Sequence, residues 1–137
     1  MENLNRQLLT NGFKFNDDLK IGTKKTLPEK IVQFGEGNFL RAFVDYMFDE
    51  INEQGLFEGG ITLIQPIPGG DFLRNVLNEQ EGLYTLIARG REDGKEVAAK
   101  RLITCVNRCI NPYVDLDTYN TCAKNPELRF VVSNTTE

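Results

Sequence analysis

The stretch that most constrains this chain is residues 31–43, which read IVQFGEGNFLRAF. A short apolar run, residues 30–34, leads through Gly35 and Gly37 into an amphipathic segment. This order predicts a buried strand, a tight glycine turn and the first turn of a helix. A strand that enters a helix in this way gathers backbone N–H groups and the positive helix end around one point, which suits a pyrophosphate.

The helix after the glycine turn has a clear period. Its apolar residues recur at helical spacing and are expected to form one buried face: Phe39, Leu40, Phe43, Val44, Met47, Phe48 and Ile51. Its charged residues fall on the other side and are expected to face solvent: Arg41, Asp45, Asp49 and Glu50. Asn38 is the expected N-cap, and Gly55 stands where a glycine ends a helix.

The segments that follow alternate between strand and helix patterns. Residues 61–64 predict a second buried strand, so strand, helix and strand form a right-handed βαβ unit. Further on, the sequence predicts a short helix capped by Asp71, a hairpin turning at Asp93–Gly94, a helix and a last buried strand: residues 71–77, 83–88 with 97–106, 116–124 and 128–133. Residues 1–29 form an N-terminal arm with little expected regular structure.

Together these elements predict an α/β fold. We expect a Rossmann-like, doubly wound and mostly parallel sheet with a β-hairpin insertion. Residues 30–137 would form this dinucleotide-binding domain. The sequence ends soon after a strand, so we expect the domain to be truncated, or completed by something else.

Composition excludes several classes of function. A net charge of −4 argues against a general nucleic-acid surface, and no apolar run approaches the ~20 residues that span a membrane. No secretory signal is visible, so a cytoplasmic location is expected. The chain has no His and three cysteines, Cys105, Cys109 and Cys122, which argues against zinc, disulfides and His catalysis. An enzyme built on this chain would use Lys, a carboxylate or Tyr, or place its proton chemistry elsewhere.

The glycine turn departs from the dinucleotide fingerprint at two places. Leu40 stands where the third glycine of G-x-G-x-x-G is expected, and Gln65 stands where an acidic residue would bind the ribose. From the residues alone, a dinucleotide site and a purely structural turn both stay open, as does the choice between NAD and NADP.

Three further residues bear on a ligand site, and two of them, Arg41 and Asn134, have two interpretations each. Arg41 either pairs with Asp45 at i, i+4 or donates to a phosphate. We expect the side chain of Phe39 to pack in the core while its backbone N–H faces a ligand. Asn134 follows a strand and is either a solvated turn residue or approaches the nicotinamide side of a bound cofactor.

Residues 35–45, GEGNFLRAFVD, closely resemble the cofactor-binding turn of the mannitol dehydrogenase family of long-chain polyol dehydrogenases. The family pattern Gly-x-Gly-x-Phe-x-Arg-Ala is met through Gly35, Gly37, Phe39, Arg41 and Ala42. Residues 80–85, QEGLYT, and 129–137, RFVVSNTTE, resemble the same family, so the match runs from about residue 30 to the end. Within the family, Glu36, Asn38 and Leu40 favour the tagaturonate reductase (altronate oxidoreductase) branch.

The resemblance implies NAD-dependent interconversion of D-tagaturonate and D-altronate, a small sugar-acid substrate and a cytoplasmic enzyme without nucleic-acid or membrane partners. The implied cofactor contacts are Phe34, Gly35, Glu36, Gly37, Asn38, Phe39, Leu40, Arg41, Ala42, Gln65 and Asn134. It implies no catalytic residue and no metal ligand in this chain, because the family's catalytic Lys, Asn and His lie in a later, mostly helical domain.

Two alternatives remain at this point. One is a sibling activity on fructuronate or mannitol, whose members more often carry His at the position of Leu40. The other is a nucleotide-binding module without catalysis, completed by a partner chain.

Overall fold

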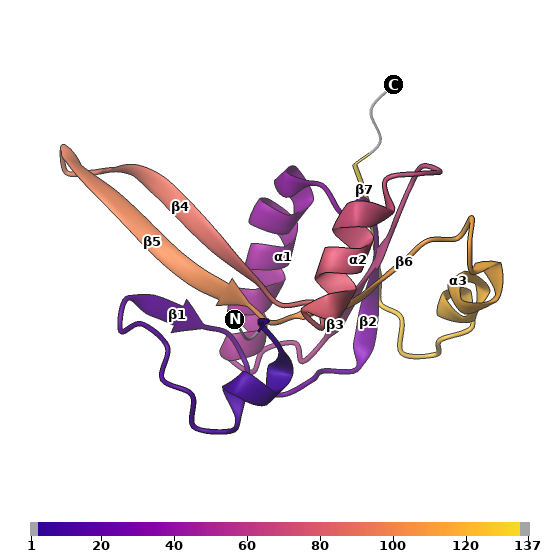
Figure 1. The fold of residues 1–137 in the computed structure, drawn as a ribbon, viewed down its shortest axis with the longest axis horizontal. Coiled ribbons are helices and arrows are strands. Elements are labelled where there is room, and N and C mark those ends of the chain that lie inside the picture. The colour runs from indigo at the N-terminus through magenta and orange to yellow at the C-terminus, as the bar shows by residue number, and fades with distance from the viewer. Residues whose placement is uncertain (1–2, 135–137) are drawn as a thin grey trace.

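A computed structural model describes residues 3–134 of the chain (Figure 1). In chain order its elements are η1 (Arg6–Leu9), β1 (Leu19–Ile21), β2 (Glu29–Phe34), α1 (Asn38–Glu53), β3 (Gly60–Ile64), α2 (Asp71–Glu79), β4 (Tyr84–Glu92), β5 (Lys95–Ile103), β6 (Val106–Ile110), α3 (Leu116–Ala123) and β7 (Phe130–Ser133). The strands form one sheet in the order β6-β3-β2-β7 and a smaller sheet in the order β1-β5-β4.

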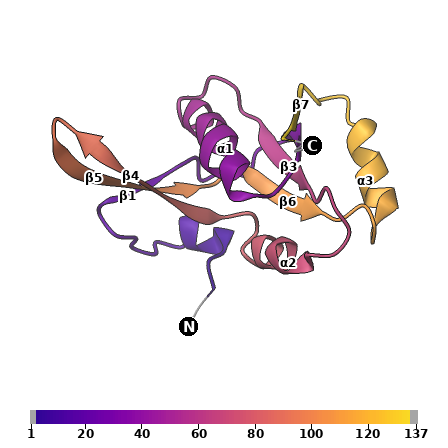
Figure 2. The same ribbon diagram turned by 90° about the horizontal axis from the view of Figure 1, so that it is seen from above.

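The larger sheet is parallel throughout, with β2 paired to both β3 and β7. Its two faces are covered by different helices. On one face Ile31 and Leu63 pack in a cluster that includes Leu77 of α2 and side chains of α1. On the other face Val32 packs in a cluster that includes Cys122 of α3. Both views show α3 set apart from α1 and α2 (Figures 1 and 2). The predicted α/β class and doubly wound, mostly parallel sheet are confirmed.

The predicted hairpin is also confirmed. Glu92 pairs with Lys95, and the two residues between them, Asp93 and Gly94, have φ of 50° and 77°. Positive φ at both positions is the geometry of the tight hairpin turn that an Asp-Gly pair favours. The β4–β5 ribbon projects away from the parallel sheet (Figures 1 and 2), and the base of β5 pairs with β1.

Two strand predictions were wrong. Residues 97–106 form parts of two strands rather than one, because β5 ends at Ile103 and β6 begins at Val106 in the other sheet. The last strand was expected to be buried, yet Phe130 and Val131 of β7 are 47% and 64% exposed. Within residues 3–134, β7 is an edge strand, paired only with β2.

The N-terminal arm has more structure than its polar composition predicted. It contains η1 and β1, and Leu8 and Leu9 of η1 are buried. The guanidinium of Arg6 donates to the carbonyl oxygens of Thr104 and Val106, at 2.9 and 2.8 Å. These bonds fasten the arm to the segment where β5 gives way to β6.

The burial of α1 reverses part of the expected pattern. Asp45 and Asp49, expected on the solvent face, are fully buried, whereas Phe39, Phe43 and Met47 are about half exposed or more. Its ends also differ slightly from expectation: Gly37 is the N-cap and Asn38 is the first helical residue, while Gly55, with φ of 70°, follows the C-cap as predicted.

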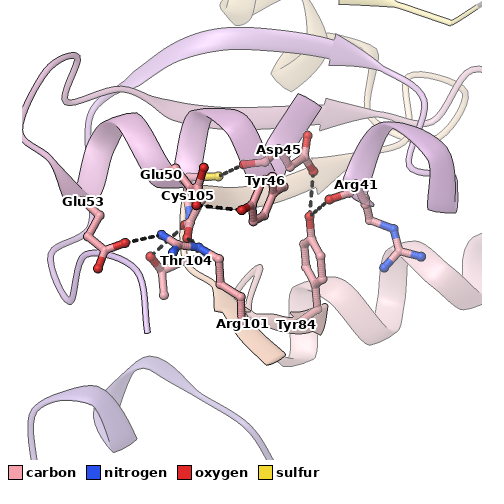
Figure 3. A network of polar contacts seen from close by, with 10 residues as sticks. Arg41, Asp45, Tyr46, Glu50, Glu53, Tyr84, Arg101, Thr104 and Cys105 are labelled. Carbon is pink, nitrogen blue, oxygen red and sulfur yellow. Dashed lines mark hydrogen bonds and ion pairs between the residues drawn. The ribbon is translucent and has the colours of Figure 1, made fainter. Parts of the chain in front are cut away.

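Asp49 is buried because it binds the junction between the two sheets. Its Oδ1 accepts from the backbone N–H groups of Thr104 and Cys105, at 2.8 and 3.0 Å, and from the Thr104 hydroxyl. Its Oδ2 accepts from Arg101 Nε at 2.6 Å. Figure 3 shows Arg101, Thr104 and Cys105 gathered beside α1. Thr104 and Cys105 are the two residues between β5 and β6, so this carboxylate holds the chain where it changes sheets.

Asp45 lies one turn earlier and contacts a tyrosine. The Tyr84 hydroxyl is 3.0 Å from Asp45 Oδ2 and 2.8 Å from the carbonyl oxygen of Arg41 (Figure 3). Burial raises the pKa of Asp45 to about 7. A hydroxyl proton serves one acceptor at a time. A protonated Asp45 that donates from Oδ2 to Tyr84, while Tyr84 donates to the carbonyl oxygen of Arg41, therefore accounts for both contacts of the hydroxyl.

The Asp49 contacts predict a large loss of stability in Asp49→Ala. The change leaves Arg101 and two backbone N–H groups without their buried partner, which should lower the free energy of unfolding by about 3–5 kcal/mol. Urea denaturation measures it. The control is Glu79→Ala, an exposed carboxylate on α2, expected to change stability by no more than about 0.5 kcal/mol. Equal effects of the two changes would contradict the role given to Asp49.

The Asp45 environment predicts a pH dependence. The folded pKa of about 7 lies above the ordinary value of 3.8, so the neutral form stabilises the fold below about pH 4 and this contribution is lost as pH rises through 7. Between pH 5 and 8 it amounts to about 2–3 kcal/mol. Asp45→Asn cannot ionise, so its urea midpoint should fall less over this range than that of the unchanged chain. A parallel fall in both would show that Asp45 does not titrate there.

Candidate functional site

A pocket of about 310 Å³ opens at the carboxyl ends of β2, β3 and β7. It is lined by residues from three segments: Gly35, Glu36, Gly37, Phe39 and Leu40 of the glycine turn and α1; Pro66, Ile67 and Leu73 beyond β3; and Asn134 after β7. In open α/β sheets this edge is where ligands bind.

The glycine turn is fixed to the sheet on one side and open on the other. Gly35 has φ of 121°, a conformation that favours glycine, and its N–H donates to the carbonyl of Ile64 at 3.0 Å. A Cβ at Gly37 would meet no atom within 4 Å among the described residues. Gly37 is also the N-cap of α1 and makes no side-chain cap. The first backbone N–H groups of α1 have no acceptor within the helix. The space beside Gly37, next to them, is open.

Arg41 stabilises this turn from within. Its Nε donates to the carbonyl oxygen of Glu36 and its Nη2 to Asn38 Oδ1, both at 2.7 Å. The guanidinium carbon also lies 5.1 Å from the centre of the Tyr84 ring. No ion pair joins Arg41 and Asp45 among residues 3–134, and Figure 3 shows the guanidinium pointing away from that carboxyl. The first of the two interpretations from sequence, an Arg41–Asp45 ion pair, is therefore wrong.

Gln65, the residue expected to face a ribose, is fully buried. Its amide Nε2 donates to the carbonyl oxygen of Ile67 at 3.0 Å and to that of Gly69. Its backbone N–H donates to Ile110 at 2.8 Å. The side chain therefore shapes the loop after β3 from inside and does not line the pocket.

The other predicted residues divide between the pocket and its surroundings. Phe39 lines the pocket, is 63% exposed and stacks on Phe43 with ring centres 5.7 Å apart. Phe34 points to the opposite face of the sheet, where it meets Tyr119 of α3. Asn38 and Ala42 are exposed and do not line the pocket.

The pocket thus gathers six of the predicted residues: Gly35, Glu36, Gly37, Phe39, Leu40 and Asn134. Sequence reasoning missed Pro66, Ile67 and Leu73, although the run Pro66-Ile67-Pro68-Gly69-Gly70 signals a loop at a strand end. The end of the third family motif, residues 135–137, lies outside the described residues.

The chemistry available here is that of binding. Backbone N–H groups and one carboxylate, that of Glu36, line the pocket. The three cysteines are free and buried, and burial raises the pKa of Cys109 to about 12. Within residues 3–134, no cluster of His, Cys, Asp and Glu is suited to hold a metal ion. None of the helices in that range is long and apolar enough to cross a membrane.

Known proteins resemble both the sequence and the fold. The model of the mannitol dehydrogenase Rossmann domain matches residues 29–137. Altronate oxidoreductase of Klebsiella pneumoniae subsp. pneumoniae is 53% identical over 111 residues, which are 80% of this chain and 23% of that protein. Altronate oxidoreductase of Bacillus subtilis is 44% identical over 110 residues, 80% of this chain and 22% of that protein.

Among solved structures, mannitol 2-dehydrogenase of Pseudomonas fluorescens, in a ternary complex with NAD and D-mannitol, superposes with a TM-score of 0.82. It is 22% identical, and the match covers 97% of this chain and 26% of that one, which supports the fold. The chain spans about a quarter of the length of these relatives. By its sequence, its glycine turn and its fold, the chain belongs to the mannitol dehydrogenase family, of which it carries the Rossmann domain.

Proposed function

We propose that this chain is the cofactor-binding part of a cytoplasmic, NAD-dependent oxidoreductase that interconverts D-tagaturonate and D-altronate by hydride transfer. The observation that carries the proposal is the open glycine turn at the start of α1, beside a pocket at the strand ends. The names of the relatives at 44–53% identity support the reaction, and the NAD complex of the solved relative supports the cofactor.

The residues of the pocket fit a dinucleotide. The space beside Gly37 and the free N–H groups of α1 suit the pyrophosphate, because the helix end carries positive partial charge. Asn134 lines the same pocket, where its amide would be a polar partner for the nicotinamide amide. Bound NAD would supply the hydride acceptor, and the protein residues would orient it. The three free, buried cysteines agree with a reducing compartment.

We assign the acid–base catalysis of this reaction to residues outside the given sequence. Glu36 is the one titratable residue that lines the described pocket, and it belongs to the cofactor turn. We therefore place the acid–base lysine, with its Asn and His partners, in a further domain of the same polypeptide. The exposed apolar side chains of α1 and β7, among them Phe43, Met47 and Val131, are suited to pack against such added chain.

Reading the encoding DNA beyond the codon of Glu137 tests this assignment. We expect an open frame that continues into a helical domain with a Lys, Asn and His signature. A stop codon at that point would instead favour a nucleotide-binding module completed by a partner chain.

The turn geometry predicts that Gly37→Val abolishes measurable NADH binding by the complete gene product. The new side chain meets no protein atom in the described structure but fills the space given to the pyrophosphate. Fluorescence titration measures binding, and the melting temperature should stay unchanged. The matched control is Gly90→Val in the hairpin, another glycine with open space around its Cβ position. Unchanged affinity in Gly37→Val would exclude the proposed pyrophosphate position.

A further inference from the structure

Glu36 is the only charged residue among those that line the described pocket. One of its carboxylate oxygens, Oε2, is buried and has no hydrogen-bond partner within residues 3–134. A buried carboxylate oxygen without a donor is costly. A pocket built around such an oxygen is therefore suited to a ligand that brings hydroxyl or N–H donors.

Glu36 lies in the glycine turn that follows β2, and it lines the pocket together with Pro66 and Ile67, which follow β3. Its carboxylate therefore belongs to the pocket wall that the ends of β2 and β3 share. This is the region where dinucleotide-binding folds place the acid that binds the adenosine ribose.

The residue expected to do this from sequence does not reach the ligand side. Gln65 is buried, and its amide is used by the loop carbonyls of Ile67 and Gly69. Its Oε1 is buried without a hydrogen-bond partner within residues 3–134, but Gln65 does not line the pocket.

We propose that the Glu36 carboxylate binds the ribose hydroxyls of the adenosine half of the cofactor and thereby selects NAD over NADP. This inference rests on the proposed function. A carboxylate accepts from a vicinal diol and repels a 2′-phosphate, so one group provides both affinity and discrimination. In this chain the acid would be supplied by the glycine turn rather than by the strand end.

The two arginines near the glycine turn, Arg41 and Arg74, do not cancel the repulsion between the Glu36 carboxylate and a 2′-phosphate. The Arg41 guanidinium donates to the Glu36 carbonyl and to Asn38. Arg74 Nε lies 3.2 Å from Asp71 Oδ1 on α2. The Arg74 contact is an ion pair in which Nε makes no hydrogen bond, and neither guanidinium group lines the pocket. Among residues 3–134, a 2′-phosphate in the pocket would meet the Glu36 carboxylate and no cation that lines the pocket.

The test is a fluorescence titration of the complete gene product with NADH and with NADPH. The unchanged protein should bind NADH more tightly. Glu36→Gln keeps the size of the side chain and removes its charge. We expect it to weaken NADH binding by roughly tenfold and to lower the preference for NADH over NADPH by at least as much. Glu36→Ser, a smaller polar change, provides a second measurement if glutamine disturbs the turn.

The matched control is Glu79→Gln, which removes an exposed carboxylate from α2 and should leave both affinities unchanged. A retained preference for NADH in both Glu36 variants, or tighter NADH binding on loss of the charge, would overturn the role of Glu36 and leave the proposed function standing. Failure of the unchanged protein to bind either cofactor would instead overturn the proposed function.

Discussion

The fold depends on one carboxylate, that of Asp49, which α1 inserts between the two sheets. It accepts from both backbone N–H groups of the β5–β6 junction and from Arg101. The same carboxylate excludes a side chain at Gly22 of the N-terminal arm, where a Cβ would overlap it. The Asp49 carboxylate of α1 thus lies where the β4–β5 hairpin, the parallel sheet and the N-terminal arm come together. Its burial is stable because its donors are present and well placed.

This anchoring has a consequence at the other end of α1. Asp45 is held by Tyr84, and the Tyr84 hydroxyl also contacts the carbonyl of Arg41, one turn nearer the glycine turn. Arg41 in turn holds the carbonyl of Glu36. A continuous chain of contacts therefore runs from the base of the hairpin to the turn. These contacts support the helix start from the side of the hairpin, whereas Phe39 and Phe43 beside it are at least half exposed.

The sequence contained enough local information for some elements and too little for others. The turn at Asp93–Gly94 and the βαβ order follow from short-range preferences, and both were predicted correctly. The burial of Asp49 was not predictable by periodicity, because its partners Thr104 and Cys105 lie more than 50 residues away. The break between β5 and β6 was hidden for the same reason, because Asp49 and Arg6, which bind the junction, both lie far from it in sequence.

The glycine turn lacks the third glycine of the dinucleotide fingerprint, and the structure shows what takes its place. The third glycine of the usual fingerprint permits close packing of helix on strand. Here Leu40 occupies that position, is buried, and has its Cδ1 3.2 Å from the Cβ position of Gly35. The leucine fills the space under the turn, while Gly35 supplies the conformation and Gly37 the opening. With two glycines and a buried leucine, the space beside Gly37 at the helix start stays open in the described structure. Leucine in place of the third glycine therefore changes the packing beneath Gly35, whereas the exposed side of the turn, at Gly37, stays open.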